Sequence, residues 1–203
     1  TDFCRYGTQN SIETGIKLEE SLEGLYTPAK VKMGVVGCPR NCAEATVKDI
    51  GLVGIEGGWQ VVIGGAAGRR VRAADILATV KTADEALRVA ELFFQYYREN
   101  GEYPERTYDF VERVGLEKIR RQTVLASKEQ QEALLERLAK AKAKVVDPWA
   151  AESDKPVHPT QFSELVLPHD RGALTEEQLD AAGDLAEDWN VSLVKVLLSR
   201  RWL

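Results

Sequence analysis

The chain has 203 residues, of which 27 are Lys or Arg and 32 are Asp or Glu, so its formal net charge is −5 at pH 7. This mildly acidic balance argues against nucleic-acid binding as the main role, and no apolar run approaches the roughly 20 residues that span a bilayer. A hydrophobic content of 44% allows a real core, and the length suits one domain plus an extension or two small domains. The first residues contain neither a basic region nor an apolar run, so we predict no secretory signal peptide.

The first third of the chain predicts a helix, a strand and a short helix. Residues 11–25 have apolar side chains at helical spacing, and Pro28 closes that element. Residues 30–37 are rich in β-branched side chains and predict a strand that ends at a cysteine-containing loop. Residues 43–49 predict a short helix with Cys42 at its N-terminus, where the helix dipole would stabilise a thiolate.

The middle of the chain predicts a hairpin followed by a long helix. Residues 50–55 and 59–63 read as two strands joined by a Glu-Gly-Gly turn. Residues 64–70 are rich in glycine and arginine, which indicates a flexible cationic loop. Residues 82–100 carry the clearest helical pattern, which Gly101 ends.

The remaining elements are predicted to be helical. Residues 107–114 and 116–122 predict two short helices that complete the compact unit, and residues 128–144 predict a charged, mostly exposed helix. Four prolines make 147–168 an irregular linker before a last helical unit from Thr175 onward. Together these elements predict an α+β fold: a mixed, largely antiparallel sheet covered by helices, with a helical C-terminal extension.

All three cysteines, Cys4, Cys38 and Cys42, fall in the first fifth of the chain. Two thiols four residues apart on a loop can hold one inorganic centre, and a third nearly completes the four thiolates of a [4Fe–4S] cluster. Ordinary buried thiols are the alternative. Zinc is disfavoured because the two histidines, His158 and His169, lie far away in the proline-rich region. An odd cysteine count without a signal peptide indicates a reducing compartment, the cytoplasm.

Four stretches carry a resemblance to a known family. They are TDFCRYGTQNS at 1–11, KMGVVGCPRNCAEA at 32–45, KDIG at 48–51 and WQVVIGG at 59–65. In order and spacing they resemble the sirohaem-dependent nitrite and sulfite reductases, and most of all the large subunit of the NAD(P)H-dependent nitrite reductase. The resemblance covers roughly residues 1–125.

The resemblance implies two cofactors, a [4Fe–4S] cluster and sirohaem. The family binds its cluster through C-x5-C followed by C-x3-C. Cys4 matches the second cysteine, Cys38 and Cys42 match the third and fourth, and the first would lie three residues before Thr1. In the family the last cysteine also bridges the cluster to the sirohaem iron, a role that falls here on Cys42. The implied reaction is the six-electron reduction of nitrite to ammonia, or of sulfite to sulfide.

Cationic side chains and glycines near the cysteines are further candidates. Arg40, inside the cysteine loop, is the candidate catalytic residue, for a macrocycle carboxylate or the substrate anion. Arg5, Lys48, Arg69 and Arg70 are either further anion ligands or solvated surface charges. Gly64 and Gly65 either end a strand in a turn or let the backbone approach the cofactor closely.

The resemblance divides the chain into three parts. Residues 1–125 would be an N-terminally truncated sirohaem and [4Fe–4S] domain, 126–147 a charged connecting helix, and 148–203 a proline-rich linker with a small helical tail. FAD and NAD(P)H would bind upstream domains, and the partners would be the upstream half of the enzyme and a small subunit. We therefore expect the isolated piece to be inactive. The alternatives are a sulfite reductase fragment and a non-catalytic interaction module with vestigial cysteines.

Overall fold

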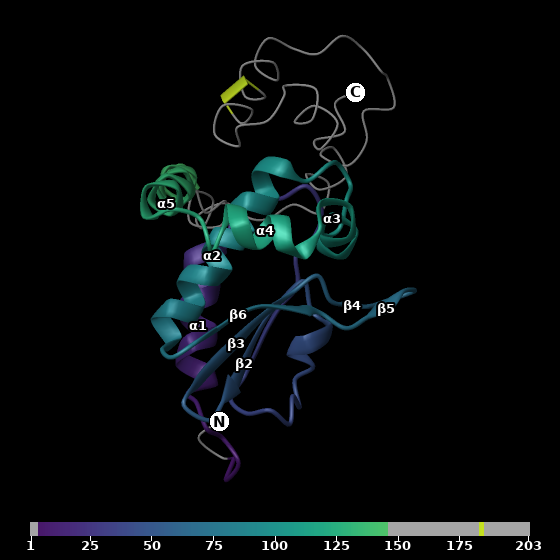
Figure 1. Cartoon of the computed structure of the whole chain (residues 1–203), viewed down its shortest axis with the longest axis vertical. Helices are drawn as coiled ribbons and strands as arrows, with labels where there is room; N and C mark the ends of the chain where they lie inside the picture. The colour runs from purple at the N-terminus through teal and green to yellow at the C-terminus, as the bar shows by residue number, and fades with distance from the viewer. Residues whose placement is uncertain (1–3, 146–182, 185–203) are drawn as a thin grey trace, which may run out of the picture.

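The computed structural model describes residues 4–145 and 183–184 (Figure 1). The elements, in chain order, are α1 (Ser11–Leu22), β1 (Met33–Val36), the 3₁₀ helix η1 (Ala45–Val47), β2 (Ile50–Ile55), β3 (Gly58–Ile63), β4 (Ala66–Ala67), β5 (Val71–Arg72), β6 (Asp75–Val80), α2 (Ala83–Asn100), α3 (Thr107–Val114), α4 (Leu116–Gln122) and α5 (Lys128–Ala143). The predicted proline-rich linker and nearly all of the predicted helical tail lie outside the described residues. Within the described part, no helix is long and apolar enough to cross a membrane.

A four-stranded sheet in the order β1-β2-β3-β6 forms the centre of the fold. β1 runs parallel to β2, whereas β2–β3 and β3–β6 are antiparallel. β2 and β3 form the predicted hairpin, in which Gly57 adopts a φ of +75° at the turn. The mixed, largely antiparallel sheet with its helices confirms the predicted α+β class.

The two faces of the sheet are covered differently. Alternate residues of β2 and β3 point to one face and pack with α1 and α2 in the main core, among them Leu52, Trp59 and Val61. On the opposite face, Val36 and Val53 pack against Ala45 of η1. Figure 1 shows α1 and α2 side by side along the sheet, with α5 beyond α2. The short connection from β1 to β2 therefore lies on the face that the long helices leave open.

Helix α2 is the main structural helix. It begins with the capping box of Thr82 and Glu85, and Gly101 follows its last residue. Phe93 and Tyr97 contact the ring of Phe110 in α3, with centroids 6.4 and 5.3 Å apart. This aromatic cluster ties the helix that covers the sheet to the helices that follow it.

Three local expectations from the sequence were wrong, and one strand was missed. Within the predicted helix at 43–49, only the 3₁₀ helix η1 forms. The predicted loop at 64–70 contains β4, which pairs with β5 directly after the loop to form a small hairpin. β6 was not predicted. In α1, Leu18 and Leu22 enter the core, but Ile12 and Ile16 of the expected apolar stripe remain 48% and 51% exposed.

Candidate metal centre

The loop that follows β1 carries Cys38 and Cys42 and has a defined conformation. Asn41 and Glu44 adopt left-handed backbone angles, with φ of 54° and 56°. Asn41 donates its backbone N–H to the Cys38 carbonyl at 3.2 Å, and its side-chain Nδ2 donates to Thr46 Oγ1 at 2.6 Å. These left-handed turns end any regular helix, which explains why η1 begins only at Ala45, after its N-cap Glu44. Cys42 is therefore not at a helix N-terminus.

The segment that follows Cys4 lies against this loop. The backbone N–H groups of Thr8 and Gln9 both donate to the Gly37 carbonyl, at 2.8 and 3.0 Å, and Thr8 Oγ1 donates to the same oxygen at 2.9 Å. Gln9 Nε2 also donates to the carbonyl of Ile55 at 3.1 Å. Because Gly37 directly precedes Cys38, these bonds hold the two cysteine-bearing segments side by side.

Arg40, in the loop that carries Cys38 and Cys42, contacts Tyr6 in the segment that carries Cys4. Its guanidinium carbon lies 3.7 Å from the centre of the Tyr6 ring, within the range of a cation–π contact. Arg5 lies 4.8 Å from the same centre and donates from Nη2 to the Tyr6 hydroxyl at 2.6 Å. The predicted residues Arg40 and Arg5 are thus brought together with Tyr6 at the cysteine loops.

The three thiols are all free, with Cys38 buried at 7% exposure and Cys4 and Cys42 exposed. In the part of the chain that the structure describes, no three His, Cys, Asp or Glu side chains lie close enough together to hold a metal ion. The segments are adjacent, but their side chains do not converge. Iron–sulfur clusters are bound by cysteine thiolates, so the ligand type of these three thiols on adjoining segments fits such a cluster. Metal binding is commonly coupled to such local ordering of its ligands.

A second feature, a cationic cavity of about 340 Å³, lies between the loop before β2, the β4–β5 hairpin and α3. Three of the predicted cations, Lys48, Arg69 and Arg70, line it, but Arg5 does not. The sequence analysis missed two further cations in its wall, Lys32 and Arg106. Each of these directly precedes a regular element, a position at which strand and helix patterns carry no signal about the side chain.

The cations of this cavity differ in how they are neutralised. Arg70 contacts Glu112 at 2.5 Å and Asp109 at 3.6 Å, and its hydrogen bond holds the pKa of the Glu112 carboxyl below its usual range. Arg106 Nη2 contacts Asp49 Oδ2 at 2.6 Å, while the buried Nε of Arg106 has no hydrogen-bond partner among the described residues. The cavity thus combines neutralised cations with a buried donor that can still bind an acceptor.

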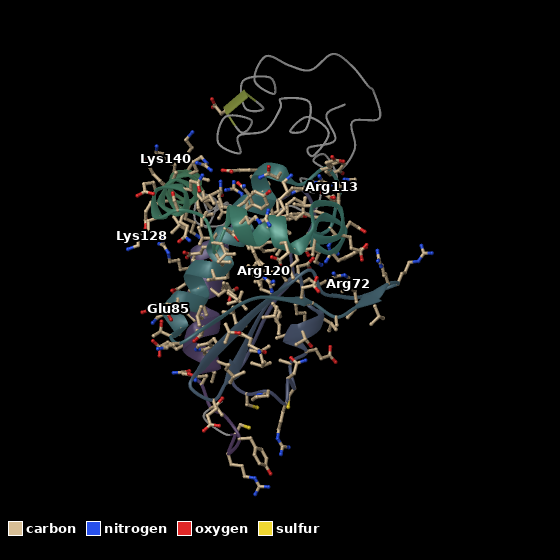
Figure 2. The ribbon with its side chains drawn as sticks, viewed as in Figure 1. Arg72, Glu85, Arg113, Arg120, Lys128 and Lys140 are labelled. Atoms are coloured by element: carbon tan, nitrogen blue, oxygen red, sulfur yellow. The ribbon has the colours of Figure 1, made fainter. Side chains whose placement is uncertain are left out.

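The β4–β5 hairpin is fastened by Arg72, which Figure 2 labels at its base. Arg72 donates from Nη1 to the Gly64 carbonyl at 2.7 Å and from Nη2 to Asp75 Oδ2 at 2.6 Å. Arg69 and Arg70 lie in the turn of this hairpin, between β4 and β5. The hairpin therefore presents its cations from a fixed base, whereas the sequence predicted a flexible loop.

Gly64 and Gly65 each have a structural reason to be glycine. Gly64 has a φ of +71°. A Cβ on Gly65 would lie 2.6 Å from the Lys48 carbonyl oxygen and 2.8 Å from Val47 Cα, and the Gly65 N–H donates to that carbonyl at 2.9 Å. Gly65 also lines the cationic cavity. Direct contact between these glycines and a cofactor remains a prediction.

Comparison with protein families identifies the domain. The model described as "Nitrite and sulphite reductase 4Fe-4S domain" matches residues 1–131. The chain belongs to this family. The resemblance stated from the sequence is thereby confirmed, and the cysteine segments and the cationic cavity both lie inside the matched region.

Individual members of the nitrite and sulphite reductase family are similar to this chain over much of its length. It is 50% identical over 147 residues to "Nitrite reductase [NAD(P)H]" of Bacillus subtilis, covering 72% of this chain and 18% of the relative. It is 42% identical over 120 residues to "Sulfite reductase, assimilatory-type" of Nitratidesulfovibrio vulgaris, covering 59% and 55%. It is 29% identical over 166 residues to "Nitrite reductase (NADH) large subunit" of Escherichia coli, covering 81% and 20%. The chain thus spans about a fifth of these nitrite reductases and about half of the sulfite reductase.

Proposed function

We propose that this domain binds a [4Fe–4S] cluster through Cys4, Cys38 and Cys42 and serves as the cluster-bearing part of an NAD(P)H-dependent nitrite reductase. The observation that carries the proposal is the triple hydrogen bond to the Gly37 carbonyl, which places the segment after Cys4 against the Cys38–Cys42 loop. This arrangement supplies three of the four thiolates that the cluster needs. The fourth would come from the polypeptide before Thr1.

Sirohaem is the second cofactor of the proposal, and Cys42 is the residue that would bridge the cluster to its iron. Together the two bound groups would supply single-electron transfer and an iron atom that can bind nitrite, which is the chemistry that reduction of nitrite to ammonia requires. Cys42 takes this role in the proposal because it matches the last cysteine of the family's motif. It is exposed, as is Cys4, whereas Cys38 is buried in the loop. FAD and NAD(P)H would bind elsewhere in the longer polypeptide, in a cytoplasmic enzyme that can include a small subunit.

The chain's own cations would hold the anionic groups. Sirohaem carries several carboxylates, and charge-assisted hydrogen bonds from guanidinium and ammonium groups are their natural partners. Lys48, which also contacts Glu44 at 3.7 Å, and Arg69 line the cationic cavity and can donate to such carboxylates. The Arg106 Nε, which has no hydrogen-bond partner among the described residues, is a third donor in its wall. Arg40, stacked on Tyr6 beside the cysteines, is the candidate for the substrate anion or a carboxylate nearer the cluster.

A second candidate function is sulfite reduction by a small enzyme. The aligned 120 residues make up 55% of the sulfite reductase of N. vulgaris, so that relative is comparable in length to this chain. Nitrite reduction is favoured because the identity to the B. subtilis nitrite reductase is higher and covers more of the chain. The two candidates differ in whether this chain can act alone.

Anaerobic loading of the 203-residue chain with iron, sulfide, sirohaem and an added small thiol tests the proposal. We expect the loaded chain to show iron–thiolate absorption but no oxidation of reduced viologen with either nitrite or sulfite. The absorption should be lost in Cys42→Ser and retained in Glu56→Gln, a substitution in the exposed turn between β2 and β3. Absorption that is unchanged in Cys42→Ser would overturn the cluster assignment. Sulfite-dependent turnover by the chain alone would favour the second candidate.

A further inference from the structure

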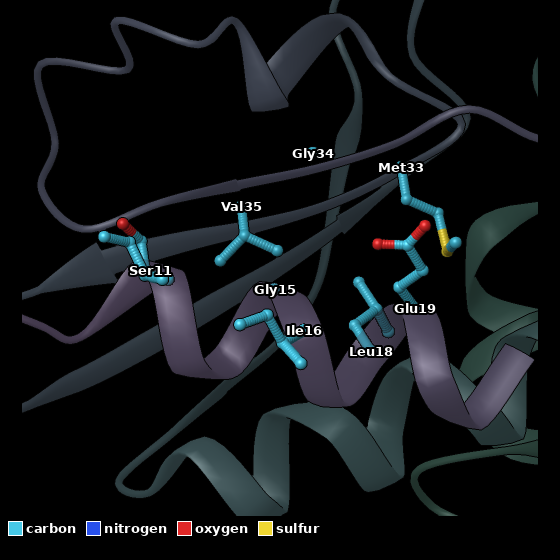
Figure 3. A pocket seen from close by; sticks show the side chains of 9 residues that line it. Ser11, Gly15, Ile16, Leu18, Glu19, Met33, Gly34 and Val35 are labelled. Atoms are coloured by element: carbon cyan, nitrogen blue, oxygen red, sulfur yellow. The ribbon is translucent and has the colours of Figure 1, made fainter.

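We propose that the outer edge of β1 and the apolar groove beside it bind one additional β-strand, contributed by a part of the longer polypeptide that lies outside this chain. The strand would extend the sheet and cover the groove between β1 and α1 (Figure 3). The inference concerns assembly of the domain and does not depend on the cluster or on its substrate. It rests on four observations.

The first observation is that β1 is an edge strand with unused hydrogen-bonding groups. Ile50 N donates to the Lys32 carbonyl, and β1 continues parallel to β2 in the register Gly34↔Gly51 and Val36↔Val53. In a parallel ladder alternate residues bond to the same neighbour, so the backbone groups of Met33 and Val35 point away from β2. Among the described residues these outward groups have no hydrogen-bond partner. Such an edge can accept another strand.

The second observation is a groove of about 520 Å³ along this edge. One wall is β1, with the side chains of Met33 and Val35, and the other is the exposed side of α1 (Figure 3). Ile12 and Ile16 line it and are 48% and 51% exposed, although they lie one helical turn apart on a helix that otherwise points its apolar residues into the core. Burying them would be favourable.

The third observation is that part of the opposite edge of the sheet is already occupied by a side chain. At β6, the guanidinium of Arg120 donates from Nε to the Leu77 carbonyl at 3.2 Å and from Nη2 to the Ile76 carbonyl at 2.6 Å. Figure 2 shows Arg120 where α4 meets the sheet. Charged side chains at an edge are a common protection against further strand pairing. A second apolar groove, of about 450 Å³, lies beside β6 at Leu77, Ala78 and Val80, and Arg120 lines it. Arg120 therefore already occupies backbone acceptors next to that groove, whereas among the described residues nothing bonds to the outward backbone groups of Met33 and Val35.

The fourth observation is that an extended segment of this chain already occupies one end of the β1 edge. Gly37, two residues after Val35, accepts hydrogen bonds from Thr8 and Gln9 through its carbonyl. That contact stops at Gln9, because α1 begins at Ser11 and turns back along the groove. The edge beyond it, at Met33 and Val35, is left for a different segment.

The occupant is assigned to the same polypeptide because of length and charge. The chain spans 18% of the B. subtilis nitrite reductase and 20% of the E. coli large subunit, so the larger part of a polypeptide of that kind would lie outside this chain and could supply the strand. A tethered segment binds at high effective concentration and needs little intrinsic affinity. Glu19 lines one end of the groove, so the segment is expected to carry apolar residues at alternate positions and a Lys or Arg at that end.

Amide hydrogen exchange of the complete gene product, compared with the isolated 203-residue chain, tests this proposal. We expect the amides of Met33 and Val35 to exchange at least about tenfold more slowly in the complete product, while those of Ile76 and Leu77 stay the same. Ile16→Lys in the complete product should remove this protection. The matched control Val71→Lys, at a residue that is 76% exposed on β5, should not.

Two results would overturn the proposal. The first is equal exchange of Met33 and Val35 in the complete gene product and in the isolated chain. The second is protection that already exists in the isolated chain and rises with its concentration, because the edge would then pair with a second copy. Neither measurement requires iron, so their outcome is independent of the proposed cluster.

Discussion

Asp49 and Arg106 form an ion pair that joins the start of β2 to the residue before α3, with Arg106 Nη2 at 2.6 Å from Asp49 Oδ2. Asp49 is 1% exposed, and its carboxylate also accepts from the backbone N–H of Lys32 at 2.8 Å and from the hydroxyl of Thr107. One buried carboxylate therefore connects both parallel strands to the helical layer and forms part of the wall of the cationic cavity.

Replacing this carboxylate should strongly destabilise the domain. Asp49→Ala leaves the Lys32 amide, the Thr107 hydroxyl and the Arg106 guanidinium without their acceptor, and we expect a loss of about 3 kcal/mol in unfolding free energy. Urea denaturation measures it. Lys17→Ala, which removes the exposed Lys17–Glu13 pair, is the control and should lower the unfolding free energy much less than Asp49→Ala does. Equal costs for the two variants would show that Asp49 does not organise this junction.

Gly65→Ala should destabilise the chain before any cofactor is bound. The added methyl would meet the backbone of Val47 and Lys48 at under 3 Å, so the β4 turn and η1 would have to separate, at a cost of about 1–3 kcal/mol. Gly68→Ala is the matched control, since nothing lies within 4 Å of its added Cβ. Thermal unfolding of the two metal-free variants makes the comparison. A Gly65→Ala variant as stable as Gly68→Ala would favour the cofactor-contact role for Gly65.

Glu91→Gln should stabilise the chain more at pH 7 than at pH 4. Burial raises the pKa of the Glu91 carboxyl, and a hydrogen bond from Ser21 and the charge of Arg88 offset this only in part. A raised pKa in the folded state means that the carboxyl favours folding while protonated and loses that contribution as the pH rises through its folded pKa. Glutamine, which has no charge to desolvate, avoids this loss. Urea denaturation of both proteins at the two pH values checks the sign, and an equal difference at both values would contradict it.

The three thiols should differ in reactivity in the metal-free chain. Cys4 and Cys42 are exposed, whereas Cys38 is 7% exposed, so a bulky disulfide reagent should reach Cys38 at least about tenfold more slowly. Variants that each keep a single cysteine assign the rates. Unfolding in urea is the control, because it should make all three rates similar. Equal rates in the folded chain would mean that the loop around Cys38 is open.

Periodic patterns predicted the fold well where local sequence and tertiary packing agree. Thr82 and Glu85 form a capping box, and the stripe that includes Phe93 and Tyr97 is buried, so α2 lies within the range predicted for it. The β2–β3 hairpin also follows from its alternating residues and its glycine turn. At the metal centre, cysteine spacing and the flanking motifs identified the family, which the match to residues 1–131 confirms.

The features that sequence could not supply depend on non-local contacts. Asp75–Val80 forms a strand because it pairs with β3, and Arg120 donates a hydrogen bond to its other edge. Both partners are distant in sequence, so the local pattern of residues 75–80 does not reveal them. The helix expected at 43–49 is reduced to η1 by the left-handed turns at Asn41 and Glu44. Arg106 lines the cationic cavity beside Asp49, its ion-pair partner, which is 57 residues away in sequence.

Iron and acid-labile sulfide, measured per chain after anaerobic reconstitution with an added small thiol, test the central claim most directly. If Cys4, Cys38 and Cys42 are three ligands of one [4Fe–4S] cluster, the chain should hold about four iron and about four sulfide. Serine at any one of the three positions should reduce both values sharply, and Glu56→Gln should change neither. About one iron per chain without sulfide, or an iron content that does not respond to the cysteine substitutions, would contradict the cluster assignment.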